Sequence, residues 1–123
     1  MVDELQNIVE DIRKFVPTLL GVVVISEDGL PLSYSFSRAW DMEDPIVISG
    51  LISSATAMME NVLKEFGDSE ASLVFTQGKE YSLLVGRSGN IFIAYIATAD
   101  TTLGTLFMAM RRQSKRIERM FAE

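Results

Sequence analysis

The stretch that decides the fold is Gly21-Val22-Val23-Val24-Ile25-Ser26-Glu27-Asp28-Gly29-Leu30-Pro31-Leu32. An Asp-Gly pair between two apolar segments predicts a β-hairpin. The first strand, residues 20–26, is apolar on both faces and is expected at the centre of a sheet. The second, residues 30–37, alternates apolar residues with Pro31 and serines. Because proline cannot donate a ladder hydrogen bond, this second strand is expected at a sheet edge.

Helices are predicted on both sides of this hairpin. Residues 3–16 carry a single apolar stripe, and Pro17 ends that helix. Residues 45–66 form a long helix, with Asp44 as its N-cap and Gly67 as its stop. Its apolar residues cover an arc of roughly 160°, wider than the ~100° that one sheet contact needs. This surplus predicts a second apolar contact.

Further strands are predicted at residues 71–77, 80–87 and 90–97, and a last helix at residues 101–121. The order α-β-β-α-β-β-β-α predicts an α/β (α+β) fold with a five-stranded antiparallel sheet in strand order 2-1-5-4-3. The first and last helices are expected on one face of the sheet and the long helix on the other. The length of 123 residues predicts a single domain over residues 1–123.

Composition excludes several functions. The net charge is −6, which argues against a nucleic-acid partner. The chain has no Cys and no His, which excludes a thiolate metal site, a Cys nucleophile and a His general base. Asp41, Glu43 and Asp44 form the densest acidic cluster, but acids at the start of a helix are favoured by its dipole. We therefore expect no catalytic residue, metal or cofactor site.

The segments that would direct the chain to a membrane are not apparent in the sequence. The start of the chain lacks the basic region of a signal peptide. The uninterrupted apolar runs, at residues 19–25 and 91–97, are too short to cross a bilayer. We expect a cytoplasmic protein with no integral membrane segment.

The hairpin quoted above, the long helix rich in small residues, the three-strand meander and Leu103-Gly104 resemble the roadblock/dynein light chain family. The resemblance covers about residues 3–121 and is that of a prokaryotic single-domain member. It implies a non-enzymatic, roadblock/profilin-like domain that dimerises by joining edge strands into one continuous sheet. Eukaryotic members serve as dynein light chains or as platforms for Rag-type GTPases. Because bacterial members activate or position a small Ras-like GTPase, we expect a homodimeric scaffold or regulator of such a GTPase.

Two interaction surfaces are predicted. The strand at residues 71–77 lacks the Pro, Lys or bulge that usually protects an edge, so it is expected to pair with its own copy beside the surplus apolar arc of the long helix. The predicted dimer interface comprises Ser72, Leu73, Val74, Phe75, Thr76, Met58, Met59 and Val62. The small, flat face of the long helix is predicted to bind the partner protein, through Ser49, Gly50, Ser53, Ser54, Ala57 and Asn61.

Other functions remain open. The chain could be a light-chain-like structural subunit of a motor or another complex, or a PAS- or profilin-like sensor of a small ligand. A sensor should enclose a cavity with convergent polar groups, and the sequence has no evident buried polar cluster. Trp40 is expected to anchor its loop on the sheet rim. The basic residues between Arg111 and Arg119 form either a solvated face near the acids of the first helix or a patch for a membrane or an acidic partner.

Overall fold

The computed structural model describes residues 2–41 and 44–121, so Glu43 of the acidic cluster lies outside the described residues. The helices are α1 (Val2–Phe15), α2 (Pro45–Glu65), α3 (Leu103–Arg112) and α4 (Ser114–Met120). The strands are β1 (Leu19–Ile25), β2 (Pro31–Phe36), β3 (Leu73–Gln77), β4 (Tyr81–Ser88) and β5 (Ile91–Thr98).

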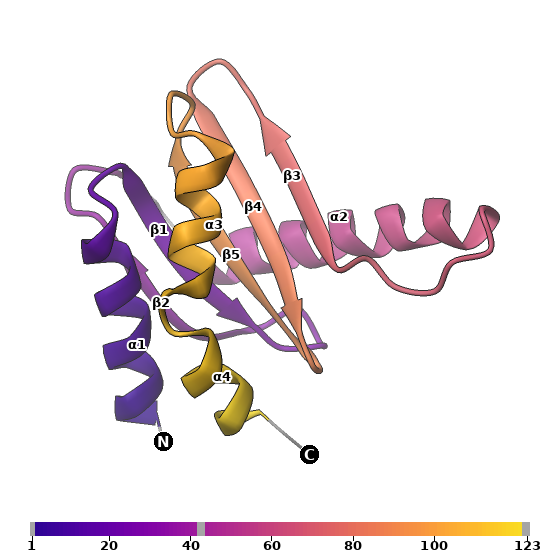
Figure 1. Cartoon of the computed structure of the whole chain (residues 1–123), viewed down its shortest axis with the longest axis horizontal. Helices are drawn as coiled ribbons and strands as arrows, with labels where there is room; N and C mark the ends of the chain where they lie inside the picture. The colour runs from indigo at the N-terminus through magenta and orange to yellow at the C-terminus, as the bar shows by residue number, and fades with distance from the viewer. Residues whose placement is uncertain (1, 42–43, 122–123) are drawn as a thin grey trace.

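The strands form one antiparallel sheet in the order β2-β1-β5-β4-β3, as the sequence predicts. The central strands β1 and β5 are buried almost throughout. The helices α1, α3 and α4 cover one face of the sheet, and α2 crosses the other (Figure 1). The predicted layers are therefore confirmed, with β2 and β3 as the two free edges.

The core is divided between the two sheet faces, and the larger part lies beneath α1, α3 and α4. There Ile8 and Ile12 of α1 meet Leu106 of α3 and Ile117 of α4 over the sheet, all at most 1% exposed. The part beneath α2 is smaller, and Ile52 is the only residue of α2 among its fully buried members. The stability of the domain therefore depends mainly on the α1 and α3 side.

The edge strand β2 alternates as predicted, and its serines face α1. Ser33 donates to the side-chain oxygen of Gln6 at 2.7 Å, and Arg13 donates to the Ser35 hydroxyl at 2.7 Å. These bonds allow both serines to be buried, because each keeps a hydrogen-bond partner. The large residues of β2, including Leu32 and Tyr34, lie on the α2 side and are partly exposed.

The predicted ends of α2 are confirmed. The Asp44 side chain accepts the backbone N–H of Ile46 at 2.9 Å, and Pro45 follows directly as the first helical residue. Gly67 has a φ of 89°, a left-handed conformation that glycine adopts without strain, so the chain can turn from the helix toward β3.

The last helix departs from the prediction of one continuous helix. It is divided at Gln113 into α3 and α4, and no side-chain hydrogen bond caps the start of α4. The Gln113 amide instead donates to Asp11 of α1 at 2.7 Å. At Gly104, in the first turn of α3, an added Cβ would meet only the Thr102 hydroxyl, at 3.9 Å, so no close packing contact requires a glycine there.

Candidate interaction surface

The helix α2 lies across the sheet and extends beyond β3, the edge strand on that side (Figure 1). Only a narrow row is buried: Ser49, Ile52 and Thr56, which share one helix face. The Thr56 hydroxyl donates to the Ile52 carbonyl at 2.9 Å, so this polar residue is buried without losing its hydrogen bond. Most of the predicted apolar arc is therefore exposed, notably Val47, Leu51, Met58, Met59, Val62 and Phe66.

Only part of the predicted partner-binding face of α2 is exposed to solvent. Ser54, Ala57 and Asn61 are exposed, whereas Gly50 and Ser53 are half-buried. Ser49 is 0% exposed, so the prediction that it belongs to a binding surface is wrong. Its small side chain lets the helix approach the sheet closely, and its hydroxyl has no hydrogen-bond partner among the described residues.

The predicted dimer strand β3 is an open edge. Ser72, Leu73, Phe75 and Thr76 are exposed, and Val74 is half-buried against the core on the α2 side. Arg87 donates its backbone N–H to the Ser72 carbonyl, and Gly78 donates to Tyr81. Because antiparallel bonding alternates along a strand, the even-numbered residues bond to β4. The backbone groups of Leu73, Phe75 and Gln77 therefore point away from the sheet.

An apolar hollow of about 310 Å³, the α2–β3 hollow, lies between the C-terminal half of α2 and β3. It is lined by Met59, Val62, Leu63, Phe66, Ala71, Leu73, Val74 and Phe75. Phe66 caps the helix and is 78% exposed. The predicted interface residues Met59 and Val62 are therefore brought beside β3, whereas Met58 does not line the hollow and is exposed.

One ion pair ties α2 to the sheet. Arg87 on β4 donates to a Glu60 oxygen at 2.6 Å, and the backbone N–H of Ala71 donates to the same oxygen at 3.0 Å. The Arg87 guanidinium also lies over the Phe92 ring, 4.4 Å from its centroid. The Ala71 N–H first, and Arg87 beside it, hold the pKa of the Glu60 carboxyl below its ordinary value. Glu60 therefore stays ionised and fixes the start of β3 against the helix.

A second apolar hollow, the Trp40 hollow, lies on the same face near the β3–β4 turn. Its volume is about 390 Å³, and its lining comprises Trp40, Ile48, Ile52, Thr76, Gly78, Tyr81, Ser82, Leu83 and Ile96. A chain of aromatic rings runs into it, from Tyr34 through Phe36 and Trp40 to Tyr81, with centroids 5.3, 5.7 and 6.0 Å apart. Sequence reasoning placed Trp40 on the rim but did not identify this hollow, because its walls come from segments far apart in the chain.

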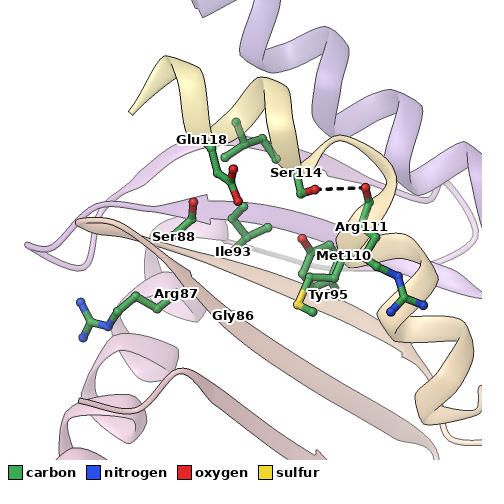
Figure 2. A pocket seen from close by; sticks show the side chains of 10 residues that line it. Gly86, Arg87, Ser88, Ile93, Tyr95, Met110, Arg111, Ser114 and Glu118 are labelled. Carbon is green, nitrogen blue, oxygen red and sulfur yellow. Dashed lines mark hydrogen bonds between the residues drawn. The ribbon is translucent and has the colours of Figure 1, made fainter. Parts of the chain in front are cut away.

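A third cavity, of about 290 Å³, lies between the α3–α4 junction and strands β4 and β5 (Figure 2). Its floor includes Ile93 and Tyr95, and burial raises the pKa of the Tyr95 phenol far above its ordinary value. Ser114 at its rim donates to the Arg111 carbonyl at 3.3 Å, and the Arg87 side chain points away from it (Figure 2). A neutral phenol and a serine without a basic partner do not form a nucleophile–base pair.

The basic face of the last helix is partly paired with α1. Arg112 donates to Asp11 at 3.0 Å and Arg116 lies 3.6 Å from Glu4, as the solvated-face interpretation expects. The hydrogen bond from Arg112 lowers the pKa of Asp11. Among residues 4–41 and 44–121, there is no cluster of three or more His, Cys, Asp or Glu side chains that could bind a metal ion.

Among the described helices, α2 alone is long and apolar enough to cross a membrane by length and composition. The apolar residues of α2 do not form one uninterrupted run, because serines and a threonine lie between them, so the sequence alone did not indicate this helix as a candidate membrane span. In this fold the helix lies on the sheet along its row of Ser49, Ile52 and Thr56.

Known structures share this fold. The chain matches Myxococcus xanthus MglB with a TM-score of 0.85 and 18% identity, over 98% of this chain and 89% of that one. A Roadblock/LC7 domain from Streptomyces avermitilis matches with a TM-score of 0.83 and 19% identity, over 96% and 98%. Acanthamoeba castellanii profilin IA matches with a TM-score of 0.63 and 9% identity, over 94% and 97%.

Sequence comparison identifies the family. No curated protein sequence matches the chain. The family model of the Roadblock/LC7 domain, however, matches residues 5–97, which run from the first turns of α1 through nearly all of β5. With three quarters of the length matched and the five strands in the predicted order, the chain belongs to the Roadblock/LC7 domain family.

Proposed function

We propose that this protein is a non-enzymatic homodimer that binds a small Ras-like GTPase and regulates or positions it. One observation carries the proposal: the exposed apolar half of α2 lies beside an unpaired strand edge at β3. An uncovered surface of this kind on a small domain marks a protein interaction site. The chain belongs to the Roadblock/LC7 family, and the proposed partner class follows from the bacterial members of that family that activate or position a small Ras-like GTPase.

The edge of β3 is suited to pairing with its own copy. The outward backbone groups of Leu73, Phe75 and Gln77 can form an antiparallel ladder centred on Phe75, in which Leu73 lies opposite Gln77 of the other protomer. A two-fold axis perpendicular to the sheet relates antiparallel strands of one sheet. Such a dimer would have a ten-stranded sheet with both α2 helices on one face.

The partner surface we propose is the outer side of α2, away from the sheet. Its exposed small and polar residues are Ser54, Ala57 and Asn61, with Gly50 and Ser53 at the margin. In the dimer two such surfaces lie on the same face and form a broad, shallow platform. A platform of this shape suits a folded protein better than a metabolite, which binds in a concave pocket.

The binding of a GTPase is tested with Asn61→Arg. A purified Ras-like GTPase from the same genome is loaded with GDP or with a GTP analogue and captured on the immobilised protein. We expect the bulky cation at residue 61 to abolish capture while the dimer and its melting temperature are retained, because Asn61 is exposed.

Asn7→Arg is the matched control, since Asn7 is an exposed helical asparagine on the opposite side of the sheet. If wild type and both variants capture the GTPase equally, the platform lies elsewhere. If the wild-type protein captures no Ras-like GTPase in either nucleotide state, the partner class is wrong, and a structural subunit of another complex becomes the better interpretation.

A further inference from the structure

We propose that the C-terminal end of α2 from one protomer, led by Phe66, fills the Trp40 hollow of the other protomer. The inference rests on the proposed homodimer. Each protomer has two exposed apolar features, and we infer that each is covered by the other protomer. Those features are the projecting half of α2 and the open hollow beside Trp40 and Tyr81. Neither is covered by the protomer's own described residues.

Symmetry brings the two features together. Phe66 lies beside the Leu73 end of its own β3, because both line the α2–β3 hollow. The Trp40 hollow lies at the other end of β3, where Thr76 and Gly78 form part of its wall. In an antiparallel pair, the Leu73 end of one strand lies against the Gln77 end of the other. The two-fold axis therefore places each Phe66 at the end of the partner sheet that holds the Trp40 hollow.

The reach of the helix agrees with this placement. Glu60 is held to Ala71, two residues before β3 begins, and the C-terminal end of α2 projects past β3 (Figure 1). Residues 61–66 add about 9 Å at 1.5 Å per residue. Strands are spaced about 4.8 Å apart, so this length carries the helix end past β3 of the other protomer, and the Phe66 side chain spans the remaining distance to its β4. Tyr81 and Leu83, on β4, form the wall of the hollow at that point.

The chemistry of the two surfaces also agrees. The hollow is lined mostly by apolar and aromatic side chains, and Tyr81 is 47% exposed. The side of α2 that faces β3 carries Met59, Val62 and Phe66, with no charged residue in the α2–β3 hollow. A phenylalanine ring against Trp40 and Tyr81 would extend the chain of aromatic rings. The Trp40 hollow of each protomer is thus filled by the Phe66 end of α2 from the other protomer.

The single tryptophan of the chain, Trp40, reports on this contact directly. Acrylamide quenching of its fluorescence is measured at a concentration at which light scattering shows a dimer. We expect Phe66→Ser to raise the quenching of Trp40 in a protein that is still dimeric, because the backbone ladder of β3 does not involve residue 66. Val47→Ser, at an exposed apolar position in the N-terminal half of α2, is the matched control and should leave the quenching unchanged.

Cross-linking gives a second, independent measurement, since the wild-type chain has no cysteine. A Phe66→Cys protein is mixed with a Tyr81→Cys protein, and the mixture is oxidised. We expect a covalent dimer in the mixture and little in either protein alone. Asn90→Cys, in the exposed β4–β5 turn at the far end of the sheet, replaces Tyr81→Cys as the control and should not link to Phe66→Cys.

The outcomes separate this inference from the proposals on which it rests. A dimer in which Phe66→Ser leaves Trp40 quenching unchanged and the 66–81 pair does not link would overturn the seating of α2, but not the dimer. A wild-type protein that is monomeric at every accessible concentration would overturn both. GTPase capture is a separate measurement, and it tests the partner class and not the seating of α2.

Discussion

Glu60 is the residue on which the geometry of the candidate surface depends most. Its carboxylate meets Arg87 of β4 and the backbone N–H of Ala71, so one side chain joins α2, the sheet and the start of β3. Both members of the ion pair are 17% exposed, which shields them from water more than an ordinary surface pair. Glu70 adds a weaker contact to Arg87 at 3.4 Å, and it is largely exposed.

Glu60→Gln should make the stability less dependent on pH. Because the pKa of Glu60 is lowered in the folded state, its ionised form adds stability above the ordinary value of 4.5, and this contribution is lost as the pH falls through the lowered pKa. Urea unfolding should show the variant to be less stable than wild type at neutral pH, with the difference shrinking in acid. Glu65→Gln, at an exposed carboxylate at the end of the same helix, should behave like wild type. A constant difference at all pH values would mean that the charge of Glu60 does not matter.

Among the strands, β3 is an edge that depends on a single neighbouring strand, β4. It pairs only with β4, and its other edge carries the outward backbone groups of Leu73, Phe75 and Gln77. Proline at Val74 would remove a donor from the ladder with β4, whereas proline at Phe75 removes a donor only from the open edge.

Phe75→Pro should therefore give a folded monomer. The substitution leaves the ladder between β3 and β4 complete and removes the N–H at the centre of the proposed ladder between protomers. Phe75→Ala retains that N–H and is the matched control, which should remain dimeric at high concentration. Light scattering measures the mass, and circular dichroism checks the fold. If Phe75→Pro is as dimeric as wild type, the protomers do not meet at β3.

Sequence reasoning was most accurate where the signal is local. The hairpin at Asp28-Gly29, the Asp44 cap and the stop at Gly67 each follow from the residues that form them. The side of α2 that lies on the sheet was not predictable in the same way. A wide apolar arc does not reveal which of its residues contact the helix's own sheet and which contact another chain. The burial of Ser33 depends on a hydrogen bond to Gln6 of α1, a partner that only the folded chain brings to it. The break in the last helix lies at Gln113, whose side chain bonds to Asp11, a residue distant in the sequence.

At the scale of the molecule, the two faces of the sheet differ in how complete they are. The face beneath α1, α3 and α4 holds the larger core, while much of the α2 face remains exposed, including Met58, Val62 and Phe66. A domain with this asymmetry gains stability when a second copy covers the open face, because burial of apolar surface is favourable.

The melting temperature of the wild-type protein should consequently rise with protein concentration. Association that favours the folded state stabilises it by mass action. Calorimetric scans over a wide dilution range should show this shift for wild type and none for the monomeric Phe75→Pro. A concentration-independent wild-type transition would indicate that the protomer is stable alone and that the dimer adds little.

The open ladder of β3 has a consequence for selectivity among related domains. Backbone N–H and C=O groups are the same in every chain, so an exposed strand accepts the edge of a paralogue as readily as its own copy. Discrimination must then come from side chains. A helix end that fits the aromatic hollow favours self-pairing, and one that clashes with it excludes the foreign subunit. In a cell that holds several such domains, the residues at positions 66 and 81 would decide which chains exchange with one another and which remain homodimers.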